Sequence, residues 1–217
     1  MLLGREEVDP DKPDNDGRTP LWYAAGNFHG SANAEGVVKL VLGREEVSPD
    51  KPDNNGMTPL SHAALRGYEG AVKMLLEREE VNSDMPDNQG RTPLWHAAAY
   101  RSDSIIPEGV VKLQLGQEKV SPDKPDNNGM TPLSHAARGG YEGAVKMLLE
   151  REEVNSDKPD NEGRTPLSHA AKEGHEGAVK MLLGREEVNP DRLDNKGRTP
   201  LWYAAGNGMA LALRREW

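Results

Sequence analysis

The sequence predicts an all-α solenoid, an elongated stack of helix-turn-helix units joined by short turns. The first observation is a repeat: Thr-Pro-Leu occurs six times, and successive copies begin 34 or 39 residues apart. The second is that the amino-acid sequence between copies recurs almost unchanged, as in residues 70–76, 143–149 and 177–183. A fixed period of this size is typical of an array in which each unit buries its apolar face against its neighbours.

The first half of a unit predicts a tight turn followed by a short helix. In residues 53–56 an Asn-Gly pair tolerates the positive φ of a turn. Thr58 can cap the helix that follows, and Pro59 fits the first helical position, where its missing N–H is harmless. Gly67 is suited to end this helix. One face of the helix carries small or aliphatic residues, namely Leu60, Ala63 and Ala64.

The second half of a unit predicts another helix and an extended return. This helix is expected from about residue 69 to residue 78, with Val72, Leu75 and Leu76 on its buried stripe. Residues 81–86 then lead back to the next turn. Because many helix positions are alanine, the paired helices can pack closely, so a sparse set of large apolar residues is sufficient for a stack.

The repeats divide the chain into units that together form one domain over residues 1–217. The units are predicted to start near residues 14, 53, 87, 126, 160 and 194. The first and third carry five extra residues between their helices, in segments 26–34 and 99–107. Residues 1–13 match the end of a unit, and the last unit is truncated, so we expect a fragment of a longer protein or a trimmed gene. We further expect the open ends to associate end to end.

The repeated motif Gly-x-Thr-Pro-Leu, followed by Ala-Ala, resembles the ankyrin repeat, and the resemblance covers essentially the whole chain. It implies an ankyrin-repeat solenoid that binds a protein partner on a concave face made of turn tips and first helices. The chain departs from the family signature, Gly-x-Thr-Pro-Leu-His-x-Ala-Ala, because Ser or Trp replaces the His. This variant of the motif, with its recurring Arg-Glu-Glu-Val, is similar to the repeats in ankyrin arrays of fungal proteins, some of them attached to NOD-like receptors.

Composition excludes several functional classes. A net charge of −9 argues against nucleic acid or an anionic membrane as a partner held by bulk charge. No stretch approaches the roughly 18–20 apolar residues of a membrane span, and residues 1–8 are too short and charged for a signal peptide. The chain has no cysteine, which excludes disulfides and thiolate metal sites. We expect an intracellular, cytoplasmic protein that needs no cofactor.

The histidines are the best candidates for metal ligands, and their spacing argues against that role. Four of them occupy one position of successive units: His62, His96, His135 and His169. Stacked helices lie roughly 8–10 Å apart, so one imidazole per layer cannot build a compact metal site. We expect these rings to be packed or hydrogen-bonded between units, and to be neutral because burial lowers their pKa below the usual value of about 6.5.

No pattern in the chain predicts catalysis. The Glu pairs, such as Glu79-Glu80, stand at helix ends, where a solvated ladder of charges is expected. Ser61 precedes a His, as do Ser134 and Ser168, but adjacent helical residues do not face each other, which argues against a Ser–His nucleophile. Phosphate-binding loops, HExxH and calcium-loop patterns are missing from the sequence. We therefore expect that the chain is not an enzyme.

Function is then expected in side chains that the fold does not require. Trp22, Trp95 and Trp202 each follow an Arg by four residues, a spacing that suits stacking of guanidinium on indole. The tryptophans have two open interpretations: they brace the units that have an altered helix link, or they anchor a partner. The candidate partner contacts are Arg18, Trp22, Met57, Leu65, Arg66, Arg91, Trp95, Met130, Arg138, Arg164, Lys172, Arg198 and Trp202.

These contacts would make the concave face locally basic and suited to an acidic partner with apolar groups. Apolar residues of the inserts, Phe28, Tyr100, Ile105 and Ile106, are further candidates. Three functions stay open. The chain is a protein-binding scaffold, or a sensing or structural arm of a larger multidomain receptor, or an engineered array without a native partner, which the near-identical units favour.

Overall fold

The computed structural model describes residues 9–26, 32–99 and 108–206, and within these ranges the chain forms eleven helices and no strand. This confirms the predicted all-α solenoid. The first helices of the units are α1 (Pro20–Gly26), α3 (Pro59–Arg66), α5 (Pro93–Ala98), α7 (Pro132–Gly139), α9 (Pro166–Glu173) and α11 (Pro200–Gly206). The second helices are α2 (Ala32–Leu42), α4 (Glu69–Leu76), α6 (Glu108–Leu115), α8 (Glu142–Leu149) and α10 (Glu176–Leu183).

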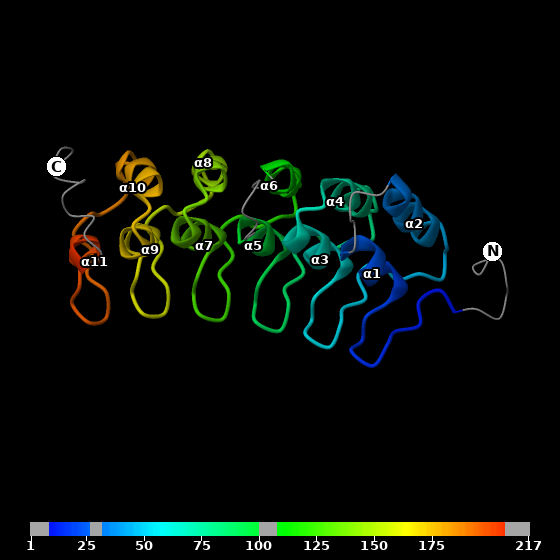
Figure 1. Ribbon diagram of the computed structural model, residues 1–217. Coiled ribbons are helices and arrows are strands. Elements are labelled where there is room, and N and C mark those ends of the chain that lie inside the picture. Colours follow the sequence, from blue (N-terminus) through cyan, green and yellow to red (C-terminus); the bar gives the residue numbers. More distant parts are fainter. Residues whose placement is uncertain (1–8, 27–31, 100–107, 207–217) are drawn as a thin grey trace.

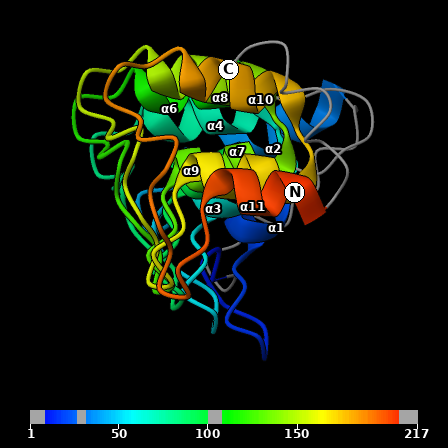
Figure 2. The ribbon, with the colours of Figure 1, turned by 90° about the vertical axis from the view of Figure 1, so that its left-hand side faces the viewer.

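The helices form two rows. Figure 1 shows the first helices in one row, the second helices in a row above it and the turn tips below. The end-on view in Figure 2 shows the helices of each row behind one another, the second helices above the first, with the loops to one side. Each helix packs on its neighbours in the same row and on its partner within the unit. None of the described helices combines the length and the apolar character that crossing a membrane requires.

The first helix begins and ends where its residues predict. The Oγ1 of Thr58 accepts a hydrogen bond from the Ser61 N–H at 3.1 Å, and Pro59 occupies the first turn. Gly67 closes α3 with a left-handed φ of 70°, a conformation that costs glycine no steric strain. The same threonine cap recurs at Thr92, Thr131 and Thr165, so one local rule fixes the start of several helices.

The second helix is shorter than predicted. α4 ends at Leu76 rather than at Arg78, because the Arg78 N–H donates to the Leu75 carbonyl three residues back and so tightens the last turn. Val72 and Leu75 are fully buried, as expected. Leu76 is only partly buried, since it lies at the edge of the stripe rather than on it.

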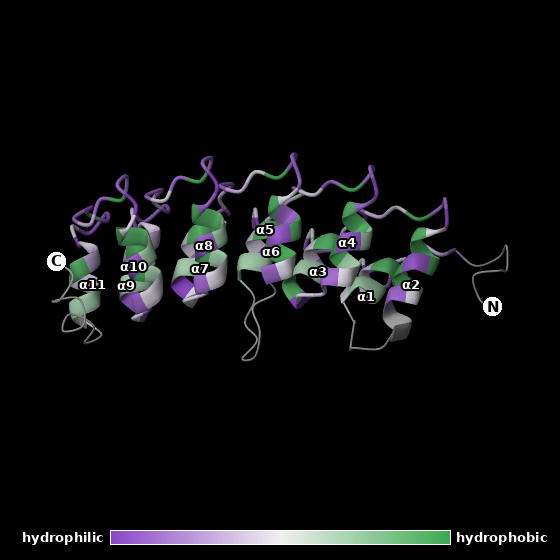
Figure 3. Cartoon of the chain, turned by 90° about the horizontal axis from the view of Figure 1, so that it is seen from above, coloured by the Kyte–Doolittle hydropathy of each residue, from purple (hydrophilic) through white to green (hydrophobic). Residues whose placement is uncertain are grey.

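The core is one continuous cluster that runs through the stack. Leu60, Ala63 and Ala64 have no exposed surface, and equivalent residues of the other units are buried with them. Seen from above in Figure 3, apolar residues lie along the helices, while hydrophilic loops occupy one edge. Several segments singled out in the sequence lie outside the described residues. They are most of the predicted insertions 26–34 and 99–107, the chain start at 1–8, and residues 207–217 of the truncated last unit.

The turn tips are built by an aspartate and a glycine. The Oδ1 of Asp53 accepts the N–H groups of Asn55 and Met57, each at 2.9 Å, and Gly56 has a φ of 79°. A Cβ on Gly56 would also lie 2.7 Å from the backbone nitrogen of Asn88, so glycine is required for both reasons. Each tip is tied to its neighbour by backbone hydrogen bonds, which sets the spacing of the units along this edge.

Candidate functional site

The predicted contacts between arginine and tryptophan are present on the first helices. The Cζ of Arg91 lies 5.3 Å from the ring centroid of Trp95, and Arg198 lies 5.1 Å from that of Trp202. Arg18 and Trp22 form the same contact. A guanidinium within about 6 Å of an indole face gains from the ring quadrupole, so these pairs order both side chains.

Arginines at this position are bound to aspartates of the tips, whether a tryptophan follows, as after Arg91, or not, as after Arg164. Arg91 Nη2 lies 2.7 Å from Asp87 Oδ2, and Arg164 Nε lies 3.0 Å from Asp160 Oδ2. Burial by itself would raise the pKa of Asp160, but hydrogen bonds from His169 and Arg164 outweigh it and lower the pKa to about 2. The guanidinium charges are therefore largely balanced inside the fold, and the expectation of a locally basic face is wrong for these positions.

The histidine position has two environments, which go together with the residue that precedes the threonine and with the side chain that the previous unit presents. Where that residue is Arg, the ring binds its own tip: His96 Nε2 lies 3.1 Å from Asp87 Oδ2, and His169 contacts Asp160 in the same way. These two rings are buried in the stack, but they make their hydrogen bond within their own unit rather than between units, because the tip carboxylate that Arg also binds lies within their reach.

Where the preceding residue is Met, the ring reaches the previous unit instead. His62 stacks on Trp22 with centroids 3.6 Å apart, and His135 lies 4.2 Å from Trp95. His62 Nδ1 also lies 3.2 Å from the Trp22 carbonyl oxygen. These two histidines therefore interact between units, as predicted.

Protonation of His62 should destabilise the fold. Burial lowers the pKa of His62 to about 4, against about 6.5 in the unfolded chain. Its contribution to stability is then complete above pH 6.5 and is lost as pH falls toward 4, with about 2 kcal/mol lost by pH 5. Urea unfolding at pH 7.5 and pH 5 measures the loss. The variant His62→Phe should lose less over this interval, whereas an equal loss would contradict the assignment to His62.

The tryptophans differ in their surroundings. Trp22 and Trp95 are each 8% exposed, and Trp22 Nε1 donates a hydrogen bond to the Met57 carbonyl at 3.0 Å. Each packs on the histidine of the next unit and so has the geometry of a brace. Trp202 is 57% exposed and presents its ring to solvent. Of the three, Trp202 is the one positioned to touch a partner.

The remaining predicted contacts lie at two levels. Met130 is buried and Met57 is partly buried beneath the tips, while Leu65 is half-buried. Arg66, Arg138 and Lys172 are exposed at the carboxyl ends of their first helices. Phe28, Tyr100, Ile105 and Ile106 lie outside the described residues.

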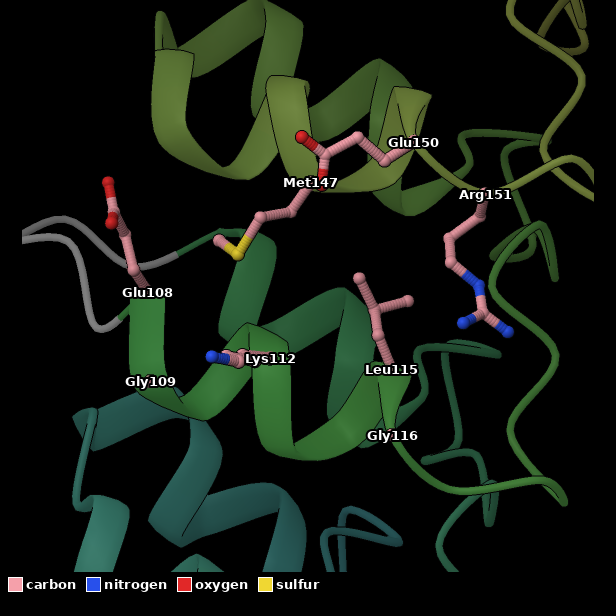
Figure 4. Close-up of a pocket in the computed structure, with 8 residues that line it drawn as sticks. All are labelled: Glu108, Gly109, Lys112, Leu115, Gly116, Met147, Glu150 and Arg151. Carbon is pink, nitrogen blue, oxygen red and sulfur yellow. The ribbon is translucent and has the colours of Figure 1, made fainter.

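The structure also shows two grooves that sequence reasoning missed, between neighbouring second helices. One lies between α2 and α4 and the other between α6 and α8, with volumes of about 800 and 690 Å³. Figure 4 shows the second groove, with Lys112 and Leu115 on one side and Met147 on the other. The signal that could have found them is that the second pair of units repeats the first pair 73 residues later, so that every residue lining one groove has an identical counterpart in the other.

A serine that precedes a histidine in the sequence takes part in a helix cap. Ser61 is buried, and its Oγ lies 3.1 Å from Thr58 Oγ1, so this hydroxyl serves the helix cap. Within the described residues, no group of three or more His, Asp or Glu side chains could hold a metal ion.

The comparisons with known proteins agree with the fold. The family model described as "Ankyrin repeats (3 copies)" matches three overlapping stretches, residues 28–108, 105–194 and 157–214. No curated protein matches the sequence. The matched stretches together cover more than half of the chain and include all the paired helices from α3 to α10. The chain belongs to the ankyrin-repeat family.

Proposed function

We propose that this chain is a non-catalytic scaffold that binds a protein partner through the concave face formed by its tips and first helices. Ankyrin repeats are generally protein-interaction modules, and the family is typically non-enzymatic. The observation that carries the proposal is a set of exposed cations at the carboxyl ends of three first helices, α3, α7 and α9: Arg66, Arg138 and Lys172. An acidic segment of a partner is their natural complement.

The pairing of the other arginines supports this choice of contacts. Arg91 and Arg164 are engaged by buried aspartates, so they hold the tips in shape rather than attract a ligand. Arg138 and Lys172 lie 3.9 and 4.0 Å from Glu173, and all three side chains are well exposed. Ion pairs of this kind contribute little, so a partner carboxylate can replace Glu173 at small cost.

Charge reversal tests the proposal. The triple variant Arg66→Glu, Arg138→Glu, Lys172→Glu should reduce recovery of a cross-linked partner from extracts of the source cell at least 10-fold. The matched control reverses three exposed lysines on the second helices: Lys73, Lys146 and Lys180. The control should retain the partner. Equal loss in both triple variants, or loss only in the control, would contradict binding at the first helices.

As the alternative, we propose a sensing or structural arm of a larger multidomain protein of the fungal NOD-like receptor type. The recurring Arg-Glu-Glu-Val and the variant repeat motif favour it. An engineered array without a native partner is the remaining alternative, supported by the near-identity of the units. Sequence flanking the gene distinguishes the two, because a receptor arm requires neighbouring domains. We place the protein inside the cell, in the cytoplasm, in keeping with its lack of cysteine.

End-to-end self-association also stays a proposal. Its support is the position of exposed large apolar side chains, which lie in the first and last described units. They are Tyr23, Val37, Leu40, Leu193, Leu201 and Trp202. An exposed apolar surface of this kind is often an interaction site.

A further inference from the structure

The two grooves between second helices form a repeated surface that the proposed function leaves unused. We call the groove between α2 and α4 groove A and the groove between α6 and α8 groove B. Glu35, Lys39 and Met74 of groove A correspond to Glu108, Lys112 and Met147 of groove B. The helices that line them, α2, α4, α6 and α8, lie in the upper row of Figure 1, above the first helices and the turn tips. Two chemically identical sites on one rigid body can bind one ligand at two points.

Each groove has an apolar floor that a glycine leaves open. In groove B, Leu115 is buried and Met147 is partly exposed, so both offer an apolar surface to an occupant. Gly116 forms the end of one wall without a side chain, whereas the equivalent position in the next unit is Glu150. Methionine adapts to irregular partners, so a floor of Met and Leu suits an aliphatic side chain.

The rim of each groove favours a basic neighbour beside that aliphatic group. In groove B the Arg151 guanidinium is already 3.2 Å from Glu153. Among the described lining residues, this leaves one ammonium, that of Lys112, against two carboxylates, those of Glu108 and Glu150. The whole chain carries a net charge of −9, which adds attraction for a cationic partner.

The spacing of the grooves sets the spacing of the ligand. They lie two layers apart, and stacked helices are roughly 8–10 Å apart, which gives roughly 16–20 Å. An α-helix rises 1.5 Å per residue, so roughly 11–13 residues, or about three turns, separate two anchors on one face. A helical ligand also fits because the backbone groups along this row are used within helices and leave none to pair with an extended chain.

We propose that grooves A and B together bind one amphipathic basic helix of a partner protein. The helix places an aliphatic side chain in each groove and a Lys or Arg beside each rim. This surface is distinct from the face of tips and first helices, so binding here and binding there can be lost separately.

A synthetic peptide tests the proposal on the full chain. The probe is a helix-forming peptide with two Leu-Lys pairs 11 residues apart, and its partner peptides carry one pair, or two pairs 7 residues apart. The methyl groups of Met74 and Met147 report on the two grooves by NMR, while Met57 and Met130 report on the tips. Only the first peptide should shift both groove signals, with affinity at least 10-fold above that of the one-pair peptide.

Groove-filling variants supply the second measurement. Gly43→Leu and Gly116→Leu each block one groove, and each should reduce affinity for the two-pair peptide at least 10-fold, while the double variant abolishes binding. Gly184→Leu is the matched control, because Gly184 ends α10 at the equivalent position in a helical conformation. The control should bind normally. Equal binding by all peptides, shifts at Met57 instead, or normal binding by the double variant would overturn the proposal.

Discussion

Replacing Trp95 by Ala is expected to lower the free energy of unfolding by about 3–5 kcal/mol, the range for removal of a buried indole. Trp95 is 8% exposed and lies between Arg91 and His135, so its loss opens a cavity between two units. Because each unit is stable only through its neighbours, a cavity at an internal interface weakens the whole array. Urea unfolding followed by circular dichroism measures the effect.

Trp202 provides the matched control. It carries the same contact with an arginine, but its ring is 57% exposed. Trp202→Ala should therefore change stability by less than about 1 kcal/mol, the value of an exposed cation–π contact. Similar losses for Trp95→Ala and Trp202→Ala would show that the stacked histidine does not decide the outcome. If Trp202→Ala alone weakens partner binding, this residue acts as an anchor.

Features fixed by local rules could be predicted from the sequence. The cap at Thr58, the proline that follows and the left-handed Gly67 each depend on residues within a few positions, so their structure follows from one unit read alone. The period of the repeat then gave the stack. This is why the fold class and the starts of the first helices agree with prediction.

Features that depend on two units could not be predicted in the same way. His62 and His96 occupy one position, yet one stacks on a tryptophan of the previous unit and the other binds its own aspartate. The choice depends on the neighbouring Arg or Met and on the previous unit at once. The grooves are also shared, since Gly116 and Met147 line one groove from different helices. Spacing along one chain does not show such pairs.

A buried amide in the third unit gives the second large effect. Gln114 is fully buried in α6, and within the described residues neither Oε1 nor Nε2 has a hydrogen-bond partner. In three of the four other second helices the equivalent residue is a leucine with no exposed surface, and in α2 it is the buried Val41: Leu75, Leu148 and Leu182 are the three leucines. A buried polar group without a partner costs about 1–3 kcal/mol, so Gln114 lowers the stability of the third unit by this amount.

Gln114→Leu should therefore raise the free energy of unfolding by about 2–3 kcal/mol, since it removes the unsatisfied amide and adds apolar contact. The shape of the site is already suited to leucine, because three other units hold one there. Urea unfolding measures the gain, and Gln89→Leu, at an exposed tip, should leave stability within about 0.5 kcal/mol.

The reciprocal substitution tests whether a buried amide is destabilising at the same position of another unit. Leu148→Gln places the same amide in the next unit and should cost about 3 kcal/mol or more, the sum of lost apolar burial and an unsatisfied group. If Gln114→Leu is instead neutral or destabilising, the amide has a partner that offsets its burial. Hydrogen exchange would then show α6 protected as well as α8. If the amide is unsatisfied, α6 exchanges faster than α8, and Gln114→Leu removes the difference, because opening of a stack begins at its least stable layer.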